Sequence, residues 1–272
     1  MTHLYQEGVA TFYSHSEGPL VRKINPLLVF RRAGLPAPRW VHVTTRARGI
    51  LRRYVERMGG FPVILKYPGL SRGVGVTRID SLPSLFSIVD YTVSHGDYSV
   101  LCAYVHPATH WRAILVGNRI VSCYRNVVDE DDFRTSGSDQ EEDYRAPVPM
   151  GLEEAAIGAV RALGHEFGGV DILEHTSGRL YVLESNHPCY FASEQLAIGT
   201  DVSGAMIEHL FQKSRRLICD VPHAPSESSK ESKFLQGAEV PAEASETTRP
   251  HQRRGNPCTE SQDECRCGPC DD

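Results

Sequence analysis

The stretch of residues 169–186 constrains the fold of this 272-residue chain more than any other. It holds two apolar runs on either side of Ser177-Gly178, a natural turn, and therefore predicts a β-hairpin. If the turn is centred there, paired residue numbers sum to a constant, and Asp171 lies directly opposite Glu184. Asn186 shares their face, because side chains alternate along a strand.

Two carboxylates that face each other across an antiparallel pair are destabilising by themselves. A divalent cation would reverse that effect, since Asp171, Glu184 and Asn186 supply the oxygen ligands that Mg²⁺ prefers. The alternative is an edge hairpin whose acids face water. Full solvation is disfavoured by the apolar flanking residues Val170, Ile172, Leu173, Val182 and Leu183.

A lysine and a glycine-rich loop follow an apolar run upstream. Lys66 ends this run, and residues 69–75 form the loop, which contains Ser71, Gly73 and Gly75. Backbone N–H groups of such a loop can hold phosphate oxygens while the lysine neutralises one. The spacing is not that of a GxxxxGK[ST] loop. A simple hairpin turn is therefore the alternative to phosphate binding.

Three arginines are candidates for binding anions. Arg112 and Arg125 lie on expected strands around the Gly117-Asn118 turn, and Arg134 follows in a polar loop. The guanidinium group suits bidentate recognition of phosphate or carboxylate. Each alone reads as a surface residue, so their convergence with the acidic hairpin is what predicts a shared site.

Helical and strand patterns interleave along the chain. Helices are expected over residues 23–33, 45–58, 82–93, 152–166 and 202–215. Strands are expected over residues 62–67, 76–79, 99–105, 111–116, 119–125, 170–174 and 180–185. Short-range hairpins among helices predict an α+β or mixed α/β fold.

Composition divides the chain near residue 220. Residues 1–20 are expected to be a short N-terminal extension, and 21–218 one domain with subdomains over 21–98 and 99–218. Residues 219–272 predict a disordered tail, because polar composition with Phe234 as its sole aromatic buries little apolar surface. The tail carries clustered thiols whose spacing is not standard for zinc: Cys258, Cys265, Cys267 and Cys270.

Bulk properties disfavour several classes of protein. A net charge of -5 does not fit a nucleic-acid-binding domain, which normally carries a basic excess. No apolar run approaches the roughly 20 residues that cross a bilayer. The N-terminus lacks the charged-then-apolar pattern of a secretory signal. A cytoplasmic protein with reduced cysteines is therefore expected.

Taken together, these motifs resemble the ATP-grasp superfamily and, within it, the RimK-like ligases, over about residues 23–193 and in the same order. The sequence from Lys23, KINPLLVFRRAGLPAP, resembles the family's entry helix, and LCAYV at residues 101–105 resembles its hinge strand. GVD at residues 169–171 and LESNHP at residues 183–188 resemble its Mg²⁺-binding segment.

The resemblance implies an ATP-grasp fold in which two α+β subdomains clasp ATP. It implies a ligase that joins a carboxylate to an amine through an acyl-phosphate, with ATP and Mg²⁺ or Mn²⁺, on a peptide, protein or amino acid. By resemblance, Asp171, Glu184 and Asn186 hold the metal. The implied nucleotide contacts are Lys23, Lys66, Ser71, Gly73, Gly75, Cys102, Tyr104 and Val105. The implied catalytic residues are Arg112, Arg125 and Arg134.

The sequence also departs from the family's pattern. Ala103 stands where the hinge acid is expected, and His110 replaces an acid before Arg112. About twenty residues precede Lys23, where relatives carry a further domain, so substrate binding is expected either to differ from theirs or to be completed by a partner protein or a second copy. The alternatives are a peptide-cyclising enzyme that forms esters or amides, and a non-catalytic nucleotide-binding module.

Overall fold

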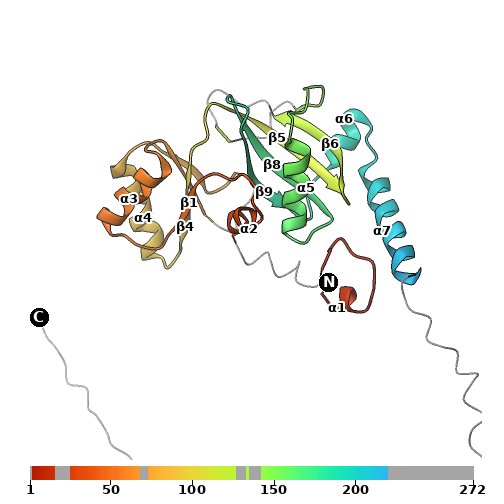
Figure 1. Cartoon of the computed structure of the whole chain (residues 1–272). Coiled ribbons are helices and arrows are strands. Elements are labelled where there is room, and N and C mark those ends of the chain that lie inside the picture. The colour runs from red at the N-terminus through yellow and green to blue at the C-terminus, as the bar shows by residue number, and fades with distance from the viewer. Residues whose placement is uncertain (1, 16–24, 68–72, 127–132, 135–141, 220–272) are drawn as a thin grey trace, which may run out of the picture. The chain divides into compact units, whose positions relative to one another are not determined.

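The computed structural model describes residues 2–15, 25–67, 73–126, 133–134 and 142–219. These residues form two antiparallel sheets with helices packed against them (Figure 1). The strands of the first sheet, in the order β1-β4-β2-β3, are β1 (Trp40–Val43), β4 (Ser99–Ala103), β2 (Val63–Lys66) and β3 (Val76–Ile79). The predicted α+β class is confirmed.

The second sheet has five strands in the order β7-β6-β5-β8-β9. They are β5 (Ala108–Val116), β6 (Arg119–Asn126), β7 (Glu142–Asp143), β8 (Phe167–His175) and β9 (Leu180–Asn186). The helices are α1 (Thr2–Gln6), α2 (Pro26–Arg32), α3 (Arg48–Met58), α4 (Leu82–Ser94), α5 (Leu152–Ala162), α6 (Ala192–Ile198) and α7 (Val202–Cys219). Among the described helices, none is long and apolar enough to cross a membrane.

Helices α3 and α4 cover one face of the four-stranded sheet. Val63 and Leu65 of β2 are buried in the same apolar cluster as residues of both helices. Because side chains alternate along a strand, Ile64 and Lys66 lie on the opposite face. Helix α3 ends at Met58 and is followed by Gly59, whose φ of 105° is readily adopted only by glycine. The fold thus leaves Lys66 away from the helices.

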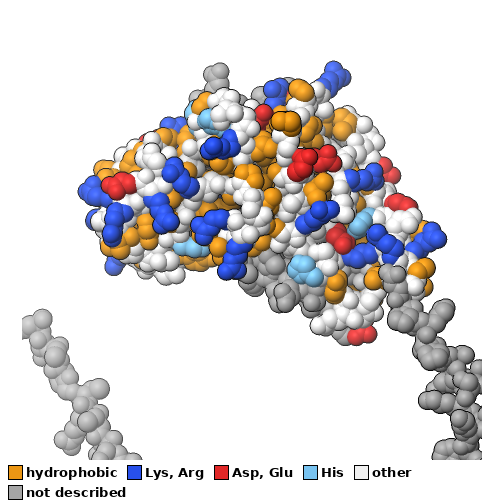
Figure 2. Space-filling view, in the orientation of Figure 1, with side chains coloured by type: hydrophobic (Ala, Val, Ile, Leu, Met, Phe, Trp, Pro, Cys, Tyr) orange, Lys and Arg blue, Asp and Glu red, His pale blue; other side chains and the backbone are white. Residues whose placement is uncertain are grey.

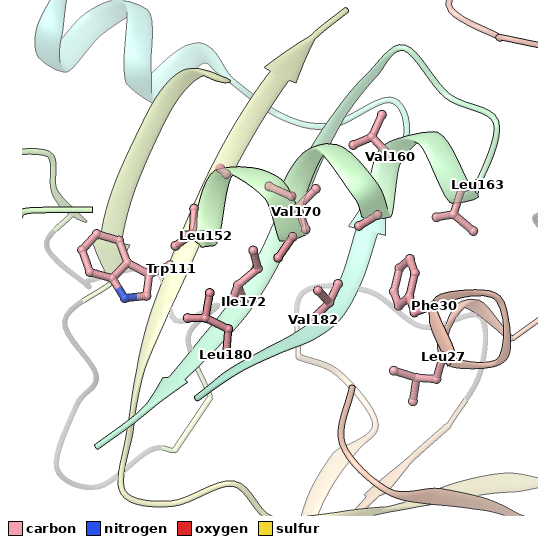
Figure 3. Close-up of a cluster of buried hydrophobic side chains, with 14 of the residues drawn as sticks. Leu27, Phe30, Trp111, Leu152, Val160, Leu163, Val170, Ile172, Leu180 and Val182 are labelled. Atoms are coloured by element: carbon pink, nitrogen blue, oxygen red, sulfur yellow. The ribbon is translucent and has the colours of Figure 1, made fainter. Parts of the chain in front are cut away.

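Helix α5 covers one face of the five-stranded sheet (Figure 3). Its Leu152 and Val160 lie over Val170 and Ile172 of β8, and Phe30 of α2 extends the same cluster. Because side chains alternate along a strand, every second residue of β5 and β8 lies on the face of the sheet that α5 does not cover. These alternate residues include His110, Arg112 and Asp171.

Strand β4 pairs with β1 and β2 and so belongs to the four-stranded sheet. The expected boundary at residues 98/99 instead assigned this strand to the second subdomain. Its register, with Ile64 opposite Cys102, moves the change of sheet to residues 104–107, between β4 and β5. The sheet to which β4 belongs is decided by its backbone pairing with β1 and β2. The pattern of apolar residues along the sequence does not reveal this pairing.

Several element bounds differ from those expected. The chain turns at Gly164, with φ of 69°, so α5 ends at Ala162 instead of residue 166. Helix α7 runs to Cys219, beyond the expected residue 215. Elements α1, α6, β1 and β7 were not predicted. The rest of the expected tail, from residue 220, lies outside the described residues.

The N-terminal segment docks on α7. The ammonium group of Lys213 donates to the carbonyl oxygens of Thr11 and Tyr13, at 2.9 and 2.7 Å. The same group lies 2.6 Å from Glu166 Oε2. Burial opposes ionisation of Glu166, but His209 and Lys213 outweigh it and lower the pKa of this carboxyl. Part of the expected N-terminal extension, at Thr11 and Tyr13, therefore contacts α7.

Candidate functional site

The predicted pairing of the two acids is confirmed, since Asp171 lies opposite Glu184. Nearer the turn the register differs by one residue, with Ile172 opposite Val182. A bulge leaves Leu183 as the extra residue and brings the two acids into the expected alignment. The expected register, in which the numbers of paired residues have one sum along the whole hairpin, is therefore wrong near the turn and correct at Asp171 and Glu184.

Asn186 joins the two acids. Its side-chain nitrogen donates to Asp171 Oδ2 at 3.3 Å and to Glu184 Oε1 at 2.8 Å. The positive end of the amide dipole thus lies between two carboxylates, where a cation would balance their charge. A half turn of the amide would present its oxygen instead, so the same side chain can serve as a ligand.

Arg112 binds Asp171 from the neighbouring strand. Its Nη1 donates to Asp171 Oδ2 at 2.6 Å, and both side chains are largely buried. Burial alone would lower the pKa of Arg112, but the adjacent carboxylate outweighs burial and raises it. Arg112 therefore stays charged and orients Asp171.

His110 approaches the other oxygen of Asp171. Its Nε2 lies 3.5 Å from Asp171 Oδ1, and its Nδ1 lies 2.6 Å from the amide nitrogen of Asn126. Burial and the charge of Arg112 lower the pKa of His110 to about 3, so the ring is neutral at physiological pH. With Asn126 donating to Nδ1, the ring proton is on Nε2 and points toward Asp171.

Glu184 has a raised pKa. Desolvation by the surrounding protein is the main cause, although the residue is exposed overall, and the charge of Asp171 is the second. Lys66 and the hydrogen bond from Asn186 act in the opposite direction. A positive charge close to Glu184 would therefore stabilise its ionised form.

Lys66 brings a positive charge from the four-stranded sheet. It is near enough to act electrostatically on Glu184 and on His110, which belong to the five-stranded sheet. It also acts on Cys102, although burial dominates there and raises the pKa of that thiol to about 11. The structure therefore brings the predicted lysine close to the acidic hairpin.

The expected hinge, residues 101–105, covers the end of β4 and the first two residues of the segment that joins the two sheets. Cys102 is buried, whereas Tyr104 and Val105 are partly buried. The ring of Tyr104 lies 6.2 Å from that of Phe133, which places the segment of Phe133 and the exposed Arg134 beside the hinge.

Gly73 and Gly75, at the end of the glycine-rich loop, have positive φ, a conformation that glycine adopts readily. The Gly75 carbonyl accepts from the Tyr67 amide at 3.1 Å and so closes the loop against β2. Lys23 and Ser71 lie outside the described residues.

Arg125 does not join Arg112. It lies opposite Trp111 across β5 and β6, so alternation places it on the other face of the sheet. Its guanidinium binds Asp143 of β7 at 2.6 Å. The sequence grouped the two arginines because both flank one turn, but their offset along the paired strands separates them.

Two supporting residues had little signal in the sequence. Asn126 reaches His110 only because β5 and β6 pair in this register. Gly169 leaves room for Arg112, since an added Cβ would lie 2.3 Å from its Nη2. Gly169 belongs to the GVD motif at residues 169–171, but its contact with the guanidinium of Arg112 depends on the pairing of β5 with β8.

Among the described residues, no group of three or more His, Cys, Asp or Glu side chains could hold a metal ion. A cation at the hairpin would draw on two carboxylates and one amide oxygen. This donor set fits Mg²⁺, which usually takes one or two carboxylates together with substrate phosphates.

Known proteins resemble this chain in sequence and in fold. The RimK-like ATP-grasp domain matches residues 23–210. A probable alpha-L-glutamate ligase of Rhodopirellula baltica is 26% identical over 190 residues, covering 69% of this chain and 46% of that protein. The ribosomal protein bS6–L-glutamate ligase of Escherichia coli is 25% identical over 167 residues, covering 61% and 55%. The chain thus spans about half the length of these relatives.

Solved ATP-grasp ligases share the fold. PsnB complexed with a minimal precursor, Mg and ADP has a TM-score of 0.61 at 20% identity, covering 78% of this chain and 65% of that chain. D-alanine–D-alanine ligase of Bacillus anthracis complexed with ATP has a TM-score of 0.59 at 16% identity, covering 79% and 73%. The family match over most of the described chain, together with this shared fold, means that the protein belongs to the RimK-like ATP-grasp domain family.

Proposed function

We propose that this protein is an ATP- and Mg²⁺-dependent ligase that joins a carboxylate to an amine through an acyl-phosphate. One observation carries the proposal: Asp171, Glu184 and Asn186 contact one another in a cluster that lies near Lys66 of the other sheet. A nucleotide between the sheets would meet a metal-binding face on one side and a lysine on the other.

The chemistry follows from the weakness of a carboxylate as an electrophile. Phosphorylation supplies a leaving group, and an amine then attacks the acyl carbon and releases phosphate. Mg²⁺ held by Asp171, Glu184 and Asn186 would neutralise charge on the transferring phosphoryl group. Lys66 would neutralise a phosphate oxygen, and Arg112 would hold Asp171 in the orientation of a ligand. Of the three arginines expected to be catalytic, Arg134 is left to stabilise the negative charge that develops during the reaction.

The substrate class is proposed from the relatives. Two of them are named as glutamate ligases, one acting on ribosomal protein bS6. We therefore propose an amino acid, peptide or protein as the source of both the carboxylate and the amine. A peptide-cyclising reaction is the second candidate, since MdnC, a macrocyclase bound with a precursor peptide, shares the fold at a TM-score of 0.55.

ADP release tests the proposal. The protein is incubated with ATP, Mg²⁺ and a panel of amino acids, acidic peptides and candidate precursor peptides. Turnover is expected with at least one acceptor and is expected to be lost in Asp171→Asn and Glu184→Gln. Glu153→Gln, an exposed residue in the first turn of α5, is the matched control and should retain activity. Nucleotide binding without turnover across the panel would instead indicate a non-catalytic module.

Mass spectrometry of the products separates the two reactions. Addition of an amino acid increases the acceptor's mass by one residue, whereas cyclisation removes one water from a single peptide. Unchanged turnover in both hairpin variants would contradict the assignment of the site.

A further inference from the structure

A cavity lies at the junction of α2, β1 and the end of α3. It has a volume of about 210 Å³. We call it the arginine pocket, and it is lined by Arg31, Leu35, Ala37, Pro38, Arg39, Trp40, Arg57 and Met58. None of these residues belongs to the acidic hairpin. The pocket therefore needs its own explanation.

Three arginines, Arg31, Arg39 and Arg57, line this pocket. The ion pairs found between arginines and acids of the described chain involve Arg48, Arg78, Arg112 and Arg125. No described acidic residue lines the arginine pocket. Like charges that converge on a concave surface repel one another, so an anion bound there would be stabilised by all three.

Specific contacts hold two arginines of the arginine pocket in place. Arg39 donates from Nη2 to the carbonyl oxygen of Met58 at 2.8 Å, and a Cβ on Gly59 would lie 2.8 Å from the same nitrogen. Arg31 lies over the ring of Trp40, with its Cζ 5.8 Å from the ring centroid. The indole N–H of Trp40 is buried and has no hydrogen-bond partner among the described residues.

The surrounding segment is strongly basic although the whole chain is acidic. Residues 31–57 contain eight arginines and one acidic residue, Glu56, whereas the full chain has a net charge of -5. Figure 2 shows Lys and Arg side chains gathered over the part of the surface that α3 helps to form. This field would attract an acidic partner from a distance before the pocket binds it.

The walls and size of the pocket indicate its ligand. Leu35, Pro38 and Met58 make part of the lining apolar. Its volume lies below the roughly 300 Å³ at which sites for whole small molecules begin, so it suits one side chain or one chain terminus. A carboxylate on a short aliphatic stem matches both the guanidinium groups and the apolar wall.

We propose that the arginine pocket binds a carboxylate of an acidic peptide segment, at a docking site separate from the acidic hairpin. Single-stranded nucleic acid fits less well, because its bases need exposed aromatic platforms. Trp40 is the aromatic residue of the lining, and Arg31 already lies over its ring. The proposal does not depend on the ligase activity proposed above.

Peptide binding tests the docking site directly. Fluorescence anisotropy follows a fluorescein-labelled hexaglutamate peptide as the full-length protein is added, with hexaglutamine as the neutral peptide. Arg31→Gln/Arg57→Gln removes two pocket charges and leaves Arg39, which supports the backbone. Arg32→Gln/Arg53→Gln removes two exposed charges from the same helices outside the pocket lining and is the matched control.

The pocket variant is expected to raise the Kd for hexaglutamate about tenfold or more, and the control variant about twofold or less. Binding should persist in Glu184→Gln, which alters only the hairpin. Equal losses in the pocket and control variants would overturn the proposal, since they would indicate diffuse attraction to the basic surface. Tighter binding of a single-stranded hexanucleotide, weakened by the same pocket variant, would also overturn it.

Discussion

Arg112 and Gly169 pack so closely that a methyl group on the glycine would lie 2.3 Å from Nη2 of the arginine. The two residues lie on neighbouring strands, β5 and β8. The absence of a side chain at Gly169 gives Arg112 the space it occupies while it binds Asp171 at 2.6 Å. A residue with no functional group of its own therefore helps to set the position of a proposed metal ligand.

Gly169→Ala should displace the guanidinium of Arg112 and destabilise the protein by about 1–3 kcal/mol, as overpacking does. It should also reduce Mg²⁺-dependent ADP release. Urea denaturation measures the first effect. Gly49→Ala is the control, because a Cβ there meets nothing within 4 Å and the residue lies in α3. A stability of Gly169→Ala equal to that of Gly49→Ala would contradict the close packing.

The raised pKa of Glu184 predicts a dependence of stability on pH when divalent cations are absent. A carboxyl whose pKa is higher in the folded than in the unfolded chain binds protons more tightly when folded, so its contribution is lost as pH rises. The loss begins near the unfolded value, about 4.3, and is complete above the folded pKa. Glu184→Gln should therefore be more stable than the parent protein at neutral pH.

Chelator-treated protein, unfolded by urea from pH 4 to pH 8, checks this expectation. The advantage of Glu184→Gln should shrink toward pH 4 and also shrink when Mg²⁺ and a non-hydrolysable ATP analogue are added. A variant that is less stable than the parent at neutral pH without cations would show that the carboxylate is favourable there by itself.

His110 should stay neutral far below the ordinary pKa of histidine. Its folded-state pKa of about 3 lies below the unfolded value of about 6.5. The sign is opposite to that of Glu184, so the stability contributed by neutral His110 is complete above pH 6.5 and is lost as pH falls toward 3. Nitrogen-15 NMR of the ring should show no titration of His110 between pH 8 and pH 5. A midpoint near 6.5 would contradict its burial beside Arg112.

Arg112 and Arg125 should differ sharply in function because they lie on opposite faces of one sheet. Arg112→Gln leaves Asp171 without its buried partner and should destabilise the protein by about 3 kcal/mol and abolish turnover. Arg125→Gln removes a partly exposed pair with Asp143 and should change stability by less than about 1 kcal/mol. Loss of turnover in Arg125→Gln, with stability retained, would restore its catalytic role.

Local patterns predicted much of the fold. Alternating apolar residues on either side of a turn were sufficient to predict the acidic hairpin and the alignment of Asp171 with Glu184. Helical spacing and a following glycine predicted the end of α3 at Met58. These features depend on residues close in the sequence, which is why single-sequence reasoning can detect them.

Features that depend on pairing between distant strands were not predictable. Strand β4 lies in the first sheet, and Arg125 lies away from Arg112, because of registers set by the whole sheet. The arrangement of Asn126, His110 and Asp171 depends on the pairing of β5 with β6 and β8. The approach of Lys66 to Glu184 depends on how the two sheets pack.

Binding of Mn²⁺ tests the central claim most directly, because it reports on the metal site without requiring turnover. Mn²⁺ replaces Mg²⁺, and electron paramagnetic resonance measures the free ion during titration in the presence of a non-hydrolysable ATP analogue. The parent protein and Glu153→Gln should bind Mn²⁺ with the same affinity, and Asp171→Asn and Glu184→Gln should each weaken binding about tenfold or more. Unchanged Mn²⁺ affinity in both hairpin variants would contradict a metal site at this hairpin.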